Sequence, residues 1–272
     1  MNKDPFHNRG YIANFDELVG DYKVRSAATR AAVSMSQGLS YGARPNEKLD
    51  LFFPKKPSGD APLHLFIHGG YWRMFDKDDF SFIAETVTAA GAIAAIIDYD
   101  LMPDVRLGAI VAQVRNAVRW LAASIGTFGG NAKQFSVSGH SAGAHLATFV
   151  MSDGAASPHI TSALLLSGIY DLKPLQSSFL QPLIGLTDKE VSEYSPLALR
   201  QSKTSNVIVA YGEHETEPFK NQAADFVHHL AEQGHGVTQH ELQDRNHMSA
   251  VRDLGIPNSA AGKLLIDIIH AA

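Results

Sequence analysis

One serine lies in a sequence context typical of an activated nucleophile. Ser141 is flanked by Gly139 and Gly143 in the run Gly-His-Ser-Ala-Gly, which fits the pattern G-x-S-x-G. The pattern alone is weak, because about one chain of this length in ten would contain it by chance. Here an apolar run at 135–137 precedes it and an Ala-rich helical segment follows it. This strand–turn–helix setting is that of a nucleophile elbow, where the first-turn N–H groups favour developing negative charge.

A second glycine-containing loop follows the apolar run at 63–67. It reads His-Gly-Gly-Tyr-Trp over 68–72. Glycines let the backbone turn its N–H groups toward a substrate, and the loop after this strand supplies an oxyanion donor in α/β-hydrolases. We expect the N–H groups of Gly70, Tyr71 and Ala142 to be the donors, and His68 to hold the loop. The predicted oxyanion hole comprises Gly69, Gly70, Tyr71 and Ala142.

A serine hydroxyl needs a base, and the chain has 13 histidines. In α/β-hydrolases the acid and then the histidine follow the serine along the chain. His247 lies after the last predicted strand, in a short loop at 244–248 before a helical stretch, so we predict that it is the base. Structural roles are expected for the histidines within predicted helices or strands or beside the acid: His145, His214, His228, His229 and His240.

The acid is expected after the strand at 207–211. Glu215 stands three residues past Gly212, in the loop before the next helix, and is our first choice. Glu213 is the runner-up, and Asp171, after the preceding strand, is a less favoured alternative. A carboxylate here would fix the His247 tautomer and stabilise the imidazolium.

Three residues are candidates for substrate contact: Tyr71, Trp72 and His140. Two interpretations of the loop aromatics have about equal weight. They could contact an aromatic leaving group, or they could pack the loop.

Strands alternate with helices along most of the chain. This alternation predicts an α/β fold with a mostly parallel sheet and helices on both faces. Strands are expected at 48–53, 63–67, 93–97, 134–137, 160–166, 207–211 and 237–242. Helices are expected within 12–35 and at 80–90, 107–125, 142–151, 219–233 and 262–270.

The alternation of predicted strands and helices is interrupted once, and the amino-acid composition does not change abruptly anywhere along the chain. We read 171–204, with three prolines among short apolar runs, as a small helical cap inserted into a single domain over 1–272. A net charge of −5 without basic clusters argues against a nucleic-acid partner. The absence of cysteine excludes disulfides and thiolate chemistry.

The expected environment is the cytoplasm. The polar stretch at 1–10 has no secretory apolar core, and no apolar run reaches the roughly 18 residues of a membrane span. The expected partner is therefore a small-molecule substrate, with no membrane, no metal and no cofactor. A homodimer is one oligomeric state that the sequence leaves open.

These motifs together resemble the kynurenine formamidase (arylformamidase) branch of the α/β-hydrolases, from about residue 49 to 247. The similar stretches are 68–72, 98–101, 139–146 and 246–247. The resemblance implies a metal-free hydrolase of the formamide of N-formylkynurenine, in tryptophan catabolism, with Ser141 and His247 in its triad. One departure concerns the acid: the family usually has Asp followed by Ser-Pro-Glu-Phe, whereas Glu215 is followed by Thr-Glu-Pro-Phe.

Three functions follow from these patterns. An arylformamidase that acts through an acyl-serine is the first. A carboxylesterase for short acyl chains would use the same residues and is the alternative. A non-catalytic binding protein on this fold is the third, and the combination of Ser141, His247 and a carboxylate argues against it.

Overall fold

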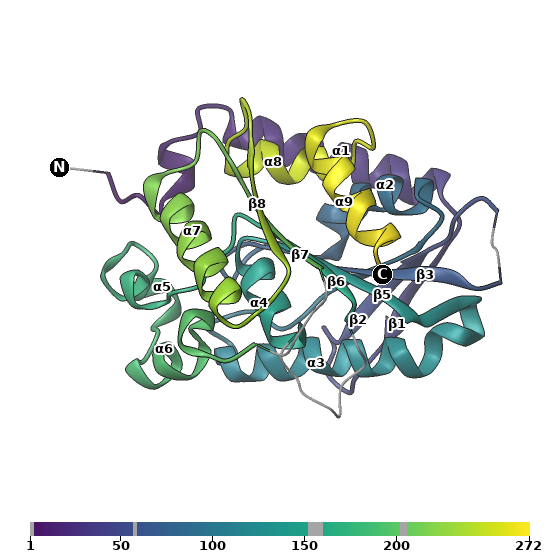
Figure 1. The fold of residues 1–272 in the computed structure, drawn as a ribbon, viewed down its shortest axis with the longest axis horizontal. Helices are drawn as coiled ribbons and strands as arrows, with labels where there is room; N and C mark the ends of the chain where they lie inside the picture. Colours follow the sequence, from purple (N-terminus) through teal and green to yellow (C-terminus); the bar gives the residue numbers. More distant parts are fainter. Residues whose placement is uncertain (1–2, 57–58, 152–159, 202–205) are drawn as a thin grey trace.

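The protein is built around one eight-stranded sheet (Figure 1). The computed structural model describes residues 3–56, 59–151, 160–201 and 206–272. The strand order is β1-β2-β4-β3-β5-β6-β7-β8. β2 pairs antiparallel with β1 and β4, and every other pairing is parallel. The strands are β1 Met35–Ser40, β2 Lys48–Phe52, β3 Ala61–Ile67, β4 Ile93–Ile97, β5 Gly130–His140, β6 Ser162–Leu166, β7 Asn206–Gly212 and β8 Val237–Leu242.

Helices cover both faces of this sheet, as expected where crossovers join parallel strands (Figure 1). One face packs against α3 Leu107–Ser124, α4 Ala142–Met151 and α7 Glu217–Glu232. The other packs against α1 Phe15–Ala32, α2 Ala84–Ala89, α8 His247–Leu254 and α9 Ala260–His270. Short 3-10 helices are η1 Asn8–Gly10, η2 Lys77–Ile83 and η3 Ile125–Phe128. The arrangement is the α/β-hydrolase fold, as the sequence predicted.

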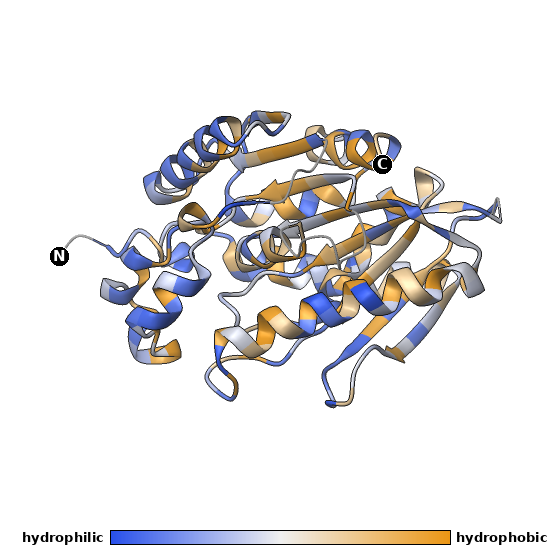
Figure 2. Ribbon diagram, turned by 60° about the horizontal axis from the view of Figure 1, so that its bottom comes forward, coloured by the Kyte–Doolittle hydropathy of each residue, from blue (hydrophilic) through white to orange (hydrophobic). Residues whose placement is uncertain are grey.

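Burial explains why the central strands have continuous apolar runs. All five residues of β4 and of β6 are buried, because helices cover both of their faces. The strands are correspondingly hydrophobic, whereas the surrounding helices mix hydrophobic and hydrophilic residues (Figure 2). No helix of the described residues is long and apolar enough to cross a membrane.

The helix expected within 12–35 is α1, but two other local predictions need correction. Strand β1, which follows α1, was not predicted. β1 is a partly exposed edge strand, so it has no apolar run or alternation to reveal it. The predicted helix at 80–90 is a 3-10 turn, η2, followed by the short α2.

The predicted cap at 171–204 connects β6 to β7. It contains η5 Lys173–Ser177, α5 Gln181–Ile184, α6 Asp188–Tyr194 and η6 Pro196–Ala198. Residues 202–204 of the predicted segment lie outside the described residues. Of these short helices, η6 contacts α7 and α6 contacts α3.

Candidate active site

Ser141 lies on a strained turn between β5 and α4. Its φ is 56°, in the left-handed region that a non-glycine residue rarely adopts. The turn packs so closely on β3 that a Cβ at Gly143 would lie 2.0 Å from the carbonyl oxygen of Ile67. The Ser141 N–H donates to the Leu166 carbonyl at 2.9 Å, which ties the turn to the end of β6. The sequence therefore folds here into the geometry of a nucleophile elbow.

The loop at 68–72 directly adjoins this turn. A Cβ at Gly69 would lie 3.2 Å from the Cβ of Ser141. Gly70 has a φ of 109°, and a Cβ there would lie 2.3 Å from the Met74 carbonyl, so the position requires glycine. Tyr71 follows with a φ of 53°.

Three backbone N–H groups at this junction are available to a substrate. Among the described residues, the N–H groups of Gly70 and Tyr71 donate to no backbone acceptor. Ala142 begins α4, and first-turn N–H groups have no acceptor within their helix. Together the three could stabilise an oxyanion beside Ser141.

Glu215 and His247 form a buried acid–base pair. Nδ1 of His247 lies 2.8 Å from Oε2 of Glu215. The other carboxylate oxygen accepts the Ser167 hydroxyl at 2.5 Å and the Gly212 N–H at 2.8 Å. These bonds fix the carboxylate, which in turn fixes the imidazole through Nδ1. Nε2 is then the ring nitrogen that the carboxylate does not contact.

His247 is held by its neighbours as well. It is the first residue of α8, not a loop residue as expected, and the Asn246 side chain caps the helix by accepting the N–H groups of Met248 and Ser249. Nε2–H of His140 donates to the His247 carbonyl at 3.0 Å. Burial, together with the neighbouring His247, lowers the pKa of His140 well below its usual value, so His140 stays neutral.

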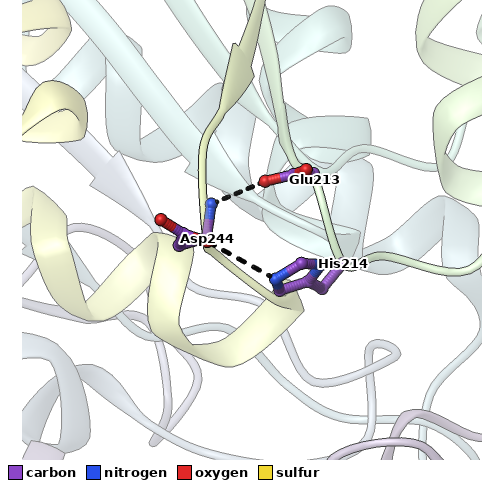
Figure 3. A group of neighbouring side chains, drawn as sticks. All are labelled: Glu213, His214 and Asp244. Atoms are coloured by element: carbon purple, nitrogen blue, oxygen red, sulfur yellow. Dashed lines mark hydrogen bonds and ion pairs between the residues drawn. The ribbon is translucent and has the colours of Figure 1, made fainter.

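The two alternative acids lie elsewhere. The Glu213 carboxylate accepts the Asp244 N–H at 2.8 Å (Figure 3). His214 lies on the same partly exposed cluster, 3.9 Å from an Asp244 oxygen (Figure 3). The Asp171 carboxylate accepts the N–H of Lys173. Of the three candidates, Glu215 is therefore the one that contacts the histidine.

Trp72 does not reach a substrate site, which corrects its assignment as a contact residue. Its side chain is fully buried, and its indole N–H donates to Nδ1 of His145 at 3.2 Å. Nε2–H of His145 donates in turn to the Tyr194 carbonyl at 2.8 Å. With a φ of 57°, Trp72 turns inward beneath the loop and packs it against α4.

Two further histidines have structural roles. His68 donates from Nδ1 to the Gly69 carbonyl at 2.8 Å and stacks on Tyr99. His64 bridges the hydroxyls of Ser136 and Ser138 across the sheet. Burial lowers the pKa of His68 to about 4 and that of His64 to about 3, so both are neutral near pH 7.

A cavity of about 280 Å³ opens onto Ser141 and His247. Tyr71 and His140, the other two predicted contact residues, also line it, and most of its other lining is apolar or aromatic. One wall comes from Phe179 of the cap. Another comes from residues 7–9, a segment in which the sequence showed no functional signal.

The Tyr71 side chain anchors that N-terminal segment. Its hydroxyl donates to the Phe6 carbonyl and accepts from the Asn8 amide. The segment also contacts the cap, since the Asp4 carboxylate accepts the Phe179 N–H and the His7 ring lies 4.6 Å from that of Phe179. The N-terminal segment, the loop and the cap therefore form the cavity together.

Ser167 is a site residue that sequence reasoning missed. It follows β6 directly, with a φ of 55°, and is fully buried against Glu215. A serine just past the carboxyl end of a buried parallel strand, next to Gly168, was the available signal.

Comparison with known proteins agrees with this geometry. Residues 49–226 match the BD-FAE family. Kynurenine formamidases of Danio rerio and Salmo salar are 32% and 30% identical, over 89% and 93% of this chain and 86% and 92% of theirs. A crystal structure of a Silicibacter protein assigned as a thioesterase superposes with a TM-score of 0.86 at 25% identity, covering 98% of both chains.

Proposed function

Because the chain belongs to the BD-FAE family and to the kynurenine formamidase branch of the α/β-hydrolases, we propose that it is an arylformamidase. In this proposal it hydrolyses the formamide of an N-formylated arylamine of the N-formylkynurenine type. Formate and the free arylamine are the products.

Ser141 is the proposed nucleophile. His247 takes the hydroxyl proton through Nε2 as the oxygen attacks the formyl carbon, and Glu215 stabilises the resulting imidazolium. The N–H groups of Gly70, Tyr71 and Ala142 bind the oxyanion. His247 then protonates the departing amine, and the formyl group remains on Ser141.

Water completes the cycle. It attacks the formyl-serine and loses its proton to Nε2 of His247, and the oxyanion again rests on the three N–H groups. Collapse of the tetrahedral intermediate releases formate and returns the proton to the serine oxygen. No redox step or cofactor is needed for this balance.

The observation that carries the proposal is the 2.8 Å hydrogen bond from buried Glu215 to His247, a residue that lines the same cavity as Ser141. The aromatic lining supports an aromatic leaving group. Tyr71 and Phe179, both in the cavity lining, meet edge to face with ring centroids 5.8 Å apart.

A carboxylesterase for short acyl chains is the second candidate. The same nucleophile, base and oxyanion donors would act on an ester, and the Silicibacter relative is assigned to thioester chemistry. The full-length similarity to kynurenine formamidases favours the amide.

The test is a parallel assay of N-formylkynurenine and p-nitrophenyl acetate with the purified protein. We expect kcat/KM for the formamide to exceed that for the ester, and Ser141→Ala to abolish both while circular dichroism stays unchanged. Ser138→Ala is the matched control and should retain turnover, because Ser138 is a buried serine of β5 that bonds to His64. Ester turnover far above formamide turnover would support the esterase instead.

A further inference from the structure

Two arginines line the cavity, and their surroundings differ. Arg9 forms an ion pair with Asp16, with both carboxylate oxygens 2.6 Å from Nη1. Arg73 has no such partner. Among the residues that the structure describes, none accepts a hydrogen bond from its guanidinium, and its Nε is buried without a partner.

An unpaired guanidinium in this position is unfavourable. Burying part of a charge removes its water, and the cost is recovered only if another group pairs with it. The side chains described around the cavity include no carboxylate: apart from Arg9 and Arg73 they are histidine, asparagine, the serine nucleophile, Met74, Met248 and aromatic residues. Of the two cations in the described lining, Arg73 is therefore the one that no side chain neutralises.

The backbone links Arg73 to the oxyanion donors. Its N–H donates to the Gly70 carbonyl at 3.0 Å, which closes a tight turn containing Tyr71 and Trp72. A group bound by the Arg73 side chain and a carbonyl bound by the N–H groups of Gly70 and Tyr71 would thus be held by one rigid turn. Such an arrangement sets the distance between a substrate's charge and its scissile bond.

We propose that Arg73 is the binding site for a carboxylate carried by the substrate. The planar guanidinium can bind both oxygens of a carboxylate at once, which gives orientation as well as affinity. The substrate class is then an aromatic acyl amide with an acid group on the leaving-group side. The choice of the leaving-group side rests on the proposed formamidase function.

The experiment compares a charged and a neutral substrate in wild type and Arg73→Met. N-formylkynurenine carries a carboxylate, and formanilide has the same scissile bond without one. We expect kcat/KM for N-formylkynurenine to fall roughly 10- to 100-fold, mainly through KM, because a hydrogen bond to a charged group is lost. The value for formanilide should stay within about twofold.

Two variants serve as controls. Arg73→Lys keeps the charge but not the paired donors, so it should recover part of the lost kcat/KM for the acid substrate. Arg9→Met removes the arginine that Asp16 already pairs, so the ratio between the two substrates should not change. Equal losses on both substrates in Arg73→Met would mean a structural role and overturn the proposal.

Inhibition separates this proposal from the formamidase assignment. With p-nitrophenyl acetate as reporter, 2-aminobenzoate should inhibit wild type more strongly than 2-aminobenzamide does, and Arg73→Met should remove the preference. That result would support the carboxylate site even if N-formylkynurenine were not turned over. Equal inhibition of wild type by both compounds would overturn the site whatever the enzyme hydrolyses.

Discussion

The Ser167 hydroxyl donates to Oε1 of Glu215 at 2.5 Å, on the carboxylate oxygen that does not face His247. Ser167 therefore acts through Glu215 and not on a substrate. It restricts the carboxylate to the orientation in which Oε2 meets the imidazole.

Removing this hydroxyl should slow turnover without unfolding the protein. We expect Ser167→Ala to lower kcat about tenfold with little change in KM, since a hydrogen bond to a carboxylate contributes on the order of 1.5–3 kcal/mol. Steady-state kinetics measure the effect. Ser162→Ala is the control, because this buried serine of β6 bonds the Ile268 carbonyl instead and should leave kcat unchanged.

The two glutamates of the β7–α7 loop should differ sharply. Glu215→Gln offers an amide to Nδ1 of His247 and cannot stabilise the imidazolium, so kcat should fall on the order of 10²–10⁴. In Glu213→Gln the amide oxygen can still accept the Asp244 N–H, and kcat should stay within about twofold. Comparable losses in both variants would contradict the assignment of Glu215.

Two glycine-to-alanine substitutions should change stability in opposite directions. Gly143→Ala forces a methyl group onto the Ile67 carbonyl, 2.0 Å away, and should lower the free energy of unfolding by about 3 kcal/mol or more. Gly20→Ala, within α1 and with nothing within 4 Å, should raise it by roughly 0.5–1 kcal/mol. Urea unfolding followed by circular dichroism gives both values.

Acid should destabilise the protein below the ordinary histidine pKa. Burial lowers the pKa of His68 and His145 to about 4 and that of His64 to about 3, from 6.5. Between those values and 6.5 the unfolded chain binds protons that the folded one does not, so the stability present above pH 6.5 is lost as pH falls. Each histidine contributes up to about 1.4 kcal/mol per pH unit.

Urea unfolding at pH 7.5, 6.0 and 5.0 measures this slope. His145→Gln can keep an acceptor for Trp72 and a donor for the Tyr194 carbonyl but does not titrate, so its slope should be shallower than that of wild type. A free energy of unfolding that stays constant from pH 7.5 to 5.0 would contradict the prediction that these three histidines remain neutral in the folded protein.

The sequence by itself determined most of the sheet and the elements around Ser141. The buried strands at 63–67, 93–97 and 162–166 could be predicted because a strand covered on both faces must be apolar throughout. The nucleophile elbow could be predicted because a sharp turn needs small residues at fixed spacing around the serine. Such features depend on near neighbours in the chain. The partly exposed edge strand β1 has no apolar run or regular alternation, so the sequence did not predict it.

Only the tertiary structure decided which side chains meet at the site. Spacing made Glu215 the first choice and left Glu213 as an alternative, whereas the pairing of β7 with β8 brings Glu215 to His247 and Glu213 to Asp244. From the sequence, Trp72 was a candidate for substrate contact. In the structure its φ is positive and its side chain lies against His145. The unpaired guanidinium of Arg73 likewise depends on which chain segments close the cavity. Contacts between distant segments are set by packing of the whole fold, and no local pattern encodes them.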